Sequence, residues 1–486
     1  MAAGIIIFLA QTHLLWQSAF LDYDSARNWQ IVQEISRGNF EHLFQHGSPS
    51  FFLFYACFTP FFRDFHAFIA LNCLLNVLAI LLTGSFVAQT FKLSTFETFL
   101  LLVFTGLSGY LVANGRYFTI EAPSLVLFAF LLPLYYNRFT QRSSQAYWQV
   151  AGLLAFGLTL NYKFLLLLPV FILLEIIYYD NILRKKHLVY TGLILLSPFI
   201  IYGLGATLVD LPFYRFMAVY FTLINNYQVP NPSSRVGFFH LDASFYLQYF
   251  LRFESFLLLG GLLLFPLLFR QQIFARARSL PINAYGYLFW IIYPLFTGMH
   301  LLQKAPRGLF LVYSLLYAIT FLSGWRVIRR KVLATGVIVL SIFYQCYVVQ
   351  KEIYAYASTK YPQVITYLKK HHITKIATTV GLGITPYAQK ASIEVISVFE
   401  EQELIPLKAQ GYRYVLLDDY YLAANIQKFK NLETTKPLVT WPEASLMALY
   451  LYLDQSDYTG FSYKQALQLR QLAVQDSIQL RLLRIP

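Results

Sequence analysis

The hydrophobic positions of this chain gather into long apolar stretches separated by short polar segments, from the first residues to about residue 350. A helix needs about 20 consecutive apolar residues to cross a bilayer. Eleven stretches are predicted as membrane-spanning helices: roughly 3–21, 67–90, 97–113, 119–136, 147–161, 164–179, 188–209, 247–269, 284–302, 307–324 and 332–350. The pattern therefore predicts an α-helical polytopic membrane protein.

The pattern changes after residue 350. Strand-length apolar runs then alternate with segments of helical character, which is typical of a small α/β domain with a parallel sheet. Three runs are predicted as buried strands: KIATTVGLGI, IEVISVF and YRYVLLDD. Gly381 and Gly383 form a GxG after the first strand. The full dinucleotide fingerprint is absent, so an ordinary glycine turn is expected, with phosphate binding as the alternative. We expect a transmembrane domain over residues 1–350 and an α/β domain over residues 351–486.

Composition supports the membrane prediction, and the distribution of charge predicts the orientation of the chain in the membrane. The chain is 57% hydrophobic and only 13% charged, whereas soluble domains carry about 25% charged residues. Its net charge of +14 is concentrated in alternate loops, near residues 92, 138–142, 184–186, 270–278 and 326–331. The positive-inside rule places those loops in the cytoplasm. Loops 22–66 and 210–246 and the α/β domain are then expected outside. The charge is explained by topology, so no nucleic-acid partner is expected.

The first outer loop opens with an acidic, polar segment, LDYDSARNWQIVQEISRGNF. Charges at the mouth of a membrane helix are costly unless they have a purpose. Asp22 and Asp24 could coordinate a divalent cation, or one could act as a base while the other tunes its pKa. The alternative is a purely structural role, with Asp24 as the N-cap of a helix that starts at Ser25.

Residues 25–37 are predicted to form a helix along the membrane interface. At helical spacing Trp29, Ile31, Val32 and Ile35 share one side of it. We expect that side to anchor the helix in the headgroup region.

Further polar residues recur at the same membrane face. Arg116 and Glu121 lie where the third predicted span ends and the fourth begins, and could orient an acceptor or close a tight turn as an ion pair. Lys304 and Arg307 lie at the start of the tenth span, where an arginine fork suits a phosphate and interfacial snorkelling is the alternative. His46 could donate a hydrogen bond to phosphate.

Signatures of common soluble enzymes are absent from the sequence. There is no GxSxG, HExxH, Walker A or kinase motif. The cysteines have no metal-ligand spacing and are read as apolar packing residues: Cys57, Cys73 and Cys346. No cofactor is firmly indicated, and a divalent metal held by Asp22, Asp24 and Glu121 is the one candidate.

The layout resembles the GT-C glycosyltransferases, most closely the branch with the protein O-mannosyltransferases and the aminoarabinose transferase of lipid A. Members of that branch often read Asp-Glu-Ala-Arg-Tyr after the first span, where this chain reads Asp24-Ser25-Ala26-Arg27-Asn28. Further matches are Gly38, the stretch His46 to Pro49, the pair Arg116 and Glu121, and Arg307 with Tyr313. The usual second acid is Ser25 here, and Gly-Ser-Pro replaces the Lys-Pro-Pro of some members.

The resemblance implies transfer of a hexose or pentose from a polyprenyl-phosphate donor to a lipid, glycan or protein acceptor. It implies an integral protein of the bacterial inner membrane with its active site facing outward. Asp24 is expected to be the base of an inverting displacement, with Asp22 and Glu121 beside it. The expected donor-phosphate ligands are Arg307, Lys304, His46, Arg116 and Arg27.

Three other functions remain open on the sequence. One is a purely structural anchor for the outer domain, although such an anchor would not require polar residues clustered at one membrane face. A ligase or polymerase of lipid-linked glycans would use the same donors, although such proteins usually place function in one large late loop. A lipid or sugar transporter would explain the spans, but no charged relay or internal repeat is visible.

Overall fold

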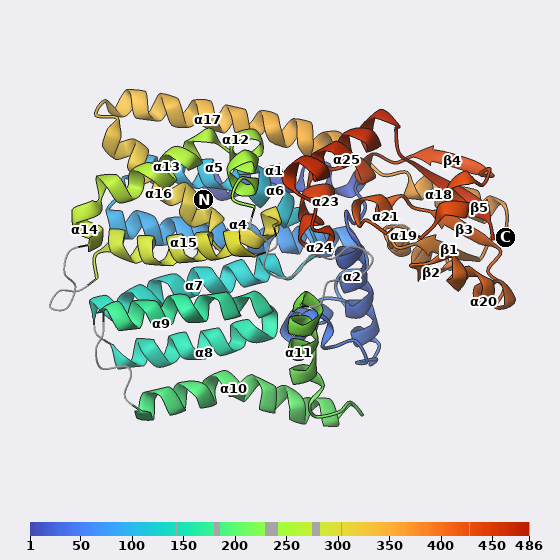
Figure 1. The fold of residues 1–486 in the computed structure, drawn as a ribbon, viewed down its shortest axis with the longest axis horizontal. Helices are drawn as coiled ribbons and strands as arrows, with labels where there is room; N and C mark the ends of the chain where they lie inside the picture. Colours follow the sequence, from blue (N-terminus) through green and yellow to red (C-terminus); the bar gives the residue numbers. More distant parts are fainter. Residues whose placement is uncertain are drawn as a thin grey trace.

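The computed structural model describes residues 1–141, 143–178, 185–228, 242–274, 282–302, 304–426 and 428–485. Parts of the predicted cytoplasmic loops and residues 229–241 of the predicted outer loop 210–246 lie outside these ranges. The described chain consists of a helical body, with its long helices running side by side, and a sheet-containing C-terminal domain at one end of them (Figure 1). This layout agrees with the change of pattern near residue 350.

The helical body extends from α1 to α17. Its long elements are α1 (Ala2–Thr12), α4 (Phe65–Phe91), α5 (Thr95–Gly106), α6 (Gly109–Arg116), α7 (Glu121–Thr140), α8 (Ser144–Leu160), α9 (Leu167–Tyr178), α10 (Lys185–Thr207), α12 (Phe245–Phe253), α13 (Phe256–Leu268), α15 (Ala284–Leu301), α16 (Tyr313–Val327) and α17 (Lys331–Glu352). Four further helices lie at their ends: α2 (Tyr23–Ser36), α3 (Pro49–Ala56), α11 (Arg215–Gln228) and α14 (Arg270–Phe274).

The eleven predicted stretches are helical over most of their length, but several are short or divided. By length and composition alone, three described helices could cross a membrane: Phe65–Phe91, Val189–Thr207 and a run Lys331–Lys370 that begins with α17. A fourth is added if α5 and α6, bent by 64° at their junction, form one span. The count of eleven spans therefore stays a prediction.

A buried carboxyl group joins two of the divided helices. Glu254 lies between α12 and α13 and is fully buried. It accepts hydrogen bonds from the Ser108 hydroxyl and the Tyr110 backbone N–H, both at the junction of α5 and α6, at 2.7 Å each. The hydroxyls of Tyr249 and Tyr317 donate to it at 2.6 and 2.7 Å. Polar groups freed where a buried helix breaks need such partners.

Glu254→Ala is expected to lower the stability of the protein strongly. It removes the acceptor of all four donors, and each buried polar group left unpaired costs about 1–3 kcal/mol. The measurement is the thermal midpoint in detergent. Ser255→Ala is the matched control at the next residue, because it removes fewer contacts: the 2.7 Å bond to Ser341 and the 3.2 Å cap on the Leu257 N–H. A midpoint no lower than that of the control would contradict the joining role of Glu254.

The C-terminal domain is built on a five-stranded sheet of order β2-β1-β3-β5-β4. Its strands are β1 (Lys375–Thr379), β2 (Glu394–Val398), β3 (Tyr414–Leu417), β4 (Val439–Pro442) and β5 (Gln479–Arg484). The three predicted strands are β1 to β3, and their parallel pairing is confirmed. The antiparallel pairs of β5 with β3 and β4 were not predicted.

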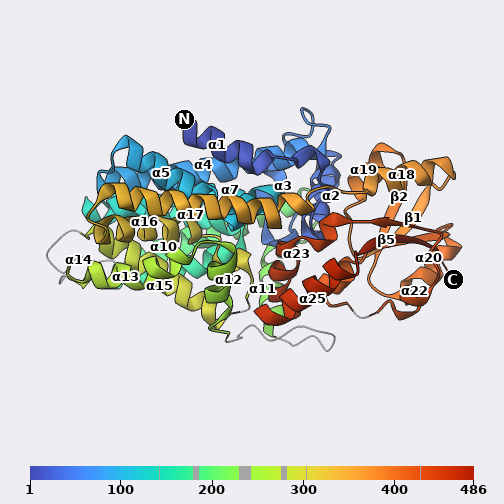
Figure 2. The same cartoon turned by 90° about the horizontal axis from the view of Figure 1, so that it is seen from above.

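Helices cover both sides of this sheet. The described helices of the domain are α18 (Tyr361–Lys370), α19 (Thr385–Lys390), α20 (Leu404–Ala409), α21 (Tyr420–Ala423), α22 (Lys430–Thr434), α23 (Leu449–Asp454), α24 (Ser456–Thr459) and α25 (Tyr463–Gln475). In Figure 2, α18 and α19 lie on one side of the sheet, and α20 and α22 on the other. The glycine turn after β1 is explained by packing, since a Cβ on Gly381 would lie 2.6 Å from the Asp418 carboxylate.

The two parts of the chain are joined by α23. Leu449, Tyr450 and Leu453 are buried in the hydrophobic core of the helical body rather than in that of the sheet. The Tyr450 hydroxyl lies 3.0 Å from that of Tyr249, which itself donates to Glu254. The C-terminal domain is therefore fixed on the helical body through a buried, hydrogen-bonded contact.

Candidate active site

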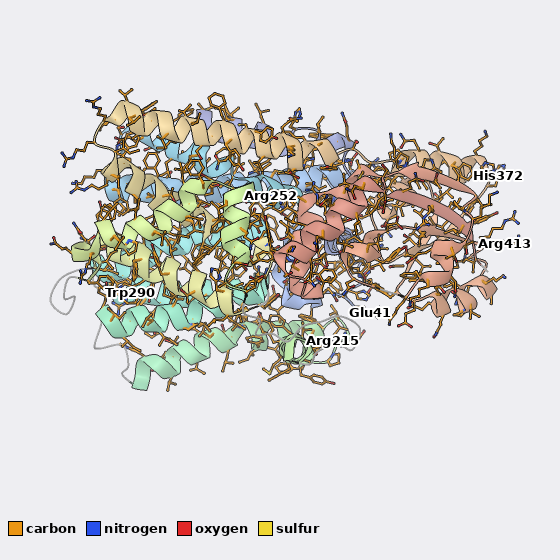
Figure 3. All side chains as sticks on the ribbon, turned by 45° about the horizontal axis from the view of Figure 1, so that its top comes forward. Glu41, Arg215, Arg252, Trp290, His372 and Arg413 are labelled. Carbon is orange, nitrogen blue, oxygen red and sulfur yellow. The ribbon has the colours of Figure 1, made fainter. Side chains whose placement is uncertain are left out.

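A cavity of about 520 Å³ lies where the ends of the helical body meet the C-terminal domain. Figure 3 shows Glu41 and Arg215, which both line it, at this junction and far from Trp290. The side chains that line it are Tyr23, Asp24, Asn28, Glu41, His42, Phe44, Gln45, His46, Thr119, Ile120, Glu121, Tyr162, Lys163, Arg215, Ala218, Val219, Thr222, Arg307, Val380, Phe399, Tyr420, Ala424, Ile426 and Gln455. Four residues predicted from the sequence are among them: Asp24, His46, Glu121 and Arg307.

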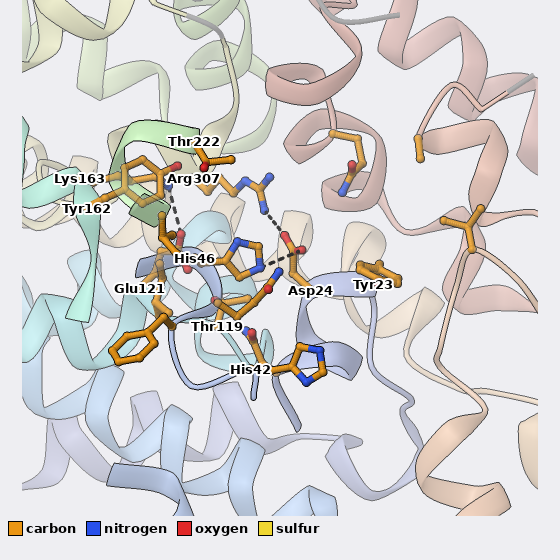
Figure 4. A pocket seen from close by; sticks show the side chains of 18 of the residues that line it. Tyr23, Asp24, His42, His46, Thr119, Glu121, Tyr162, Lys163, Thr222 and Arg307 are labelled. Carbon is orange, nitrogen blue, oxygen red and sulfur yellow. Dashed lines mark hydrogen bonds and ion pairs between the residues drawn. The ribbon is translucent and has the colours of Figure 1, made fainter. Parts of the chain in front are cut away.

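Asp24 projects into this cavity from the first turn of α2. One carboxylate oxygen lies 3.4 Å from Nη1 of Arg307, and the other lies 3.7 Å from Nε2 of His46. Figure 4 shows Asp24 with these two side chains on one side and Tyr23 on the other. The Asp24 side chain is 32% exposed, so a molecule in the cavity can reach it.

Two neighbours of Asp24 hold α2 against the segment that carries Glu121. The backbone N–H of Phe118 donates to Ser25 Oγ, and Asn28 Nδ2 donates to the carbonyl of Phe118, both at 3.1 Å. Ser25 and Asn28 thus satisfy both backbone groups of one residue from adjacent turns of a helix. The residues that depart from the Asp-Glu-Ala-Arg-Tyr pattern therefore set the position of Asp24 relative to Glu121.

Glu121 is buried at the start of α7 and pairs with a cation from the next predicted outer loop. Lys163 Nζ lies 3.1 Å from a Glu121 oxygen, and it also lies over the Phe310 ring. The turn that carries Lys163 is fixed by Asn161, whose side chain accepts the Lys163 backbone N–H at 2.9 Å. The Glu121–Lys163 ion pair is thus a second pair of opposite charges in the cavity, in addition to Asp24 and Arg307 (Figure 4).

Arg307 is held by the C-terminal domain. It lies in a short 3₁₀ helix, Pro306–Leu309, whose first N–H groups have no partner within the helix. The Arg307 N–H instead donates to Oδ1 of the buried Asp454, at the end of α23, at 3.0 Å. The position of the guanidinium therefore depends on how the C-terminal domain is seated.

His46 has a backbone conformation that only the surrounding structure can impose. Its φ is +53°, in the left-handed region that non-glycine residues rarely adopt. Gly47 follows with φ +65°, and a Cβ there would lie 3.1 Å from the Tyr220 ring. Strained residues of this kind concentrate at functional sites. The turn therefore directs the His46 ring toward Asp24.

The N-cap of α2 is Asp22 rather than Asp24, so the alternative in which Asp24 caps this helix was wrong. Oδ1 of Asp22 accepts the Ser25 N–H at 2.9 Å. Only 6% of Asp22 is exposed, and it is not among the residues lining the cavity. Burial, followed by the charge of Asp24, raises the pKa of the Asp22 carboxyl to about 7. In this structure Asp22 caps a helix and acts on Asp24 only through charge.

This raised pKa predicts a pH dependence of stability. Folding makes Asp22 bind its proton more tightly, so its contribution is greatest below about pH 4 and is lost as the pH rises toward about 7. Asn caps helices as well as Asp does but does not titrate. The thermal midpoint of wild type relative to Asp22→Asn is therefore expected to fall between pH 4 and pH 7. A difference that stays constant over that range would contradict it.

The apolar side of α2 also differs from its prediction. Trp29, Ile31, Val32 and Ile35 are each no more than 5% exposed and pack in the core of the helical body. The expectation that they anchor the helix in lipid headgroups was wrong. The reason is that α3, which was not predicted, packs against α2.

Three cations expected at the donor phosphate lie outside the cavity. Arg116 is buried and donates to the carbonyls of Gln11 and His13, where α1 ends, at 3.2 and 2.6 Å. Arg27 pairs with Glu34 along α2 at 3.3 Å. Lys304 is buried, and its amine donates to the Leu302 carbonyl.

The structure also bears on the candidate metal site. Among the described residues, no three His, Cys, Asp or Glu side chains come together as a ligand set. Asp22 is occupied as a cap and Glu121 by Lys163. The residues expected to hold a divalent cation therefore do not fit one together, and no step below uses a metal.

Several lining residues were not among the predicted site residues. Arg215 and Lys163 carry charge in predicted outer loops, and that location was the available signal. Phe399, Tyr420 and Gln455 come from the C-terminal domain, where nothing in the sequence distinguishes them from core or surface residues.

Comparison with known proteins gives the fold. No family model and no curated protein sequence matches the chain. Among solved structures it is similar to ArnT from Cupriavidus metallidurans bound to undecaprenyl phosphate, with a TM-score of 0.53 and 11% identity over 88% of this chain and 94% of that one. The apo state of the same protein gives a TM-score of 0.51 and 13% identity, covering 87% and 93%. Identities this low show the fold alone, and the GT-C fold expected from the sequence is confirmed.

Proposed function

We propose that this protein of GT-C fold is a membrane glycosyltransferase that moves a sugar from a polyprenyl-phosphate donor to an acceptor at the outer face. The observation that carries the proposal is Asp24, a reachable carboxylate between His46 and Arg307 in a cavity at the end of the helical body. A base beside a cation is what this displacement requires, because the acceptor must lose a proton while the departing phosphate gains charge.

The donor phosphate is assigned to the side of the cavity where Arg307 lies. A guanidinium fork offers two parallel hydrogen bonds to phosphate oxygens. His46 and Lys163 line the same cavity and add donors near it. The ArnT structure with undecaprenyl phosphate supports this class of donor. The lipid tail would then lie between the apolar helices.

Asp24 acts as the base. A carboxylate oxygen takes the proton from the acceptor hydroxyl, and the hydroxyl oxygen forms a bond to the anomeric carbon. The bond from that carbon to the phosphate oxygen breaks, and its electron pair leaves with the polyprenyl phosphate. One direct displacement inverts the anomeric centre, as in two-carboxylate hydrolases of the inverting class. When Arg307 turns to the phosphate, its pairing with Asp24 at 3.4 Å is released.

Glu121 has a supporting part in this scheme. Its pairing with Lys163 fixes an anion and a cation beside the reacting groups, where they orient the acceptor and the donor. Arg116, Arg27 and Lys304 have other partners and are left out of the donor site.

The proposed location is a bacterial inner membrane with the cavity and the C-terminal domain on the outer side. The basic loops near residues 92 and 326–331 support this orientation through the positive-inside rule. The apolar exposed side chains of α10 and α17 support contact with lipid, among them Leu193, Ile201 and Leu340.

The test is release of free polyprenyl phosphate by the purified protein from a panel of polyprenyl-phosphate sugars, with mixed envelope acceptors and a parallel arm containing EDTA. Release that requires both donor and acceptor supports the proposal. If folded wild type releases none from any donor, the proposal fails, and transport of the lipid in vesicles becomes the function to measure. Loss of activity with EDTA would overturn the metal-independent scheme.

A further inference from the structure

The cavity has two chemically different walls. The part formed by the helical body carries the charged groups, including Asp24, Glu121, Lys163, Arg215 and Arg307. The C-terminal domain contributes six described residues to the lining, and none of them is charged: Val380, Phe399, Tyr420, Ala424, Ile426 and Gln455. We call these six residues the neutral wall.

Polar and aromatic groups on the neutral wall are held in place. Gln455 Nε2 donates to the hydroxyl of the buried Tyr420 at 2.9 Å. Phe399 is 41% exposed, and its ring meets that of Tyr23 edge to face with centroids 5.8 Å apart. Tyr23 directly precedes Asp24 and lies beside it in Figure 4. The rings of Phe399 and Tyr23 therefore lie next to Asp24, the proposed base.

The backbone of the turn at Val380 is also part of the neutral wall, and its conformation is fixed. Val380 has φ +58°, which is a strained conformation for a β-branched residue. Two hydrogen bonds of 2.9 Å hold it, one from its N–H to the Val398 carbonyl and one from the Ser397 hydroxyl to its own carbonyl. The strain is maintained by the sheet, so the neutral wall has a defined shape.

The donor phosphate is assigned to the cations of the helical body, which leaves the neutral wall as the side from which an acceptor meets Asp24. An anionic acceptor placed there would be desolvated next to the Asp24 carboxylate with no cation from the wall to balance it, which is costly. A sugar ring carries no charge, and its C–H face packs on aromatic rings while its hydroxyls reach an amide such as that of Gln455.

We propose that the neutral wall binds the acceptor as an uncharged glycan, which presents a sugar hydroxyl to Asp24. This inference rests on the proposed function and names its acceptor class. The hydroxyl proton passes to Asp24, the oxygen bonds to the anomeric carbon of the donor, and polyprenyl phosphate leaves with the electron pair. The product is the same neutral glycan extended by one sugar.

The test pairs neutral oligosaccharides based on glucose, mannose and N-acetylglucosamine with phosphomonoesters of the same sugars. Transfer by wild type is expected with a neutral probe and not with its phosphorylated counterpart. Phe399→Ala is expected to raise the acceptor KM roughly 3- to 10-fold, in line with the value of one aromatic contact. The donor KM should stay unchanged, and Phe399→Trp should restore the acceptor KM.

Ile405→Ala is the matched control, since Ile405 is 74% exposed in the same domain and does not line the cavity. Preference for the phosphorylated probes, or an acceptor KM that Phe399→Ala leaves unchanged, would overturn the inference while the transferase function stands. If no donor is consumed, the transferase function fails. Saturation-transfer NMR with the neutral probes then tests whether the neutral wall binds a glycan. A signal in wild type that Phe399→Ala abolishes supports it, and no signal in wild type overturns it.

Discussion

Asp24→Asn is expected to reduce sugar transfer by roughly 10²–10⁴-fold, the usual contribution of a positioned general base. The fold should survive, because Asp22 caps α2 and the Asp24 carboxylate makes only the longer contacts to Arg307 and His46. The measurement is the rate of polyprenyl phosphate release in a single turnover with donor and acceptor saturating.

Asp22→Asn is the control for this experiment. It makes the same carboxyl-to-amide change two residues away, on a side chain outside the cavity, and it keeps the cap. Its transfer rate is expected to stay within a few fold of wild type. An Asp24→Asn rate close to that of Asp22→Asn would show that Asp24 is not the base.

Arg307→Ala is expected to lower transfer by about 10²–10³-fold, the cost of removing one group that stabilises charge developing in a transition state. The loss should appear in turnover as well as in the donor KM, because the charge on the phosphate grows as the bond breaks. Arg307→Lys should recover part of it, since lysine keeps the charge but not the planar fork. The backbone bond to Asp454 is unaffected by either substitution.

Arg27→Ala is the matched control for Arg307. Arg27 lies on α2, three residues from Asp24, but its guanidinium pairs with Glu34 and does not line the cavity. Its substitution is expected to leave donor KM and turnover near wild type. Equal losses for the two arginines would place the phosphate elsewhere than beside Arg307.

The sequence was sufficient to predict the broad layout of the fold. Apolar stretches marked the helices, and the runs of strand length marked β1 to β3. Strand β5, with the sequence QLRLLR, carries charges within a short segment and resembles a solvated helix end as much as a strand. Its place in the sheet depends on pairing with β3 and β4, which are distant in sequence, so local pattern cannot reveal it.

The candidate site was only partly predictable, for a related reason. Residue type shows that an arginine needs oxygen partners but not which ones. Arg307 meets a carboxylate in the cavity, whereas Arg116 meets backbone carbonyls at the end of α1. The neutral wall gave no signal because uncharged residues such as Phe399 and Gln455 are common everywhere.

The insertion of α23 into the core of the helical body has a consequence for biosynthesis. Residues from Leu449 to Asp454 are translated after every helix from α1 to α17, yet the Arg307 turn needs Asp454 and the α12–α13 break contacts Tyr450. A nascent chain that has completed its apolar helices therefore still lacks a finished cavity. If the proposed function holds, ribosome-bound and prematurely terminated chains would be inactive and would consume no donor until the C-terminal domain has docked.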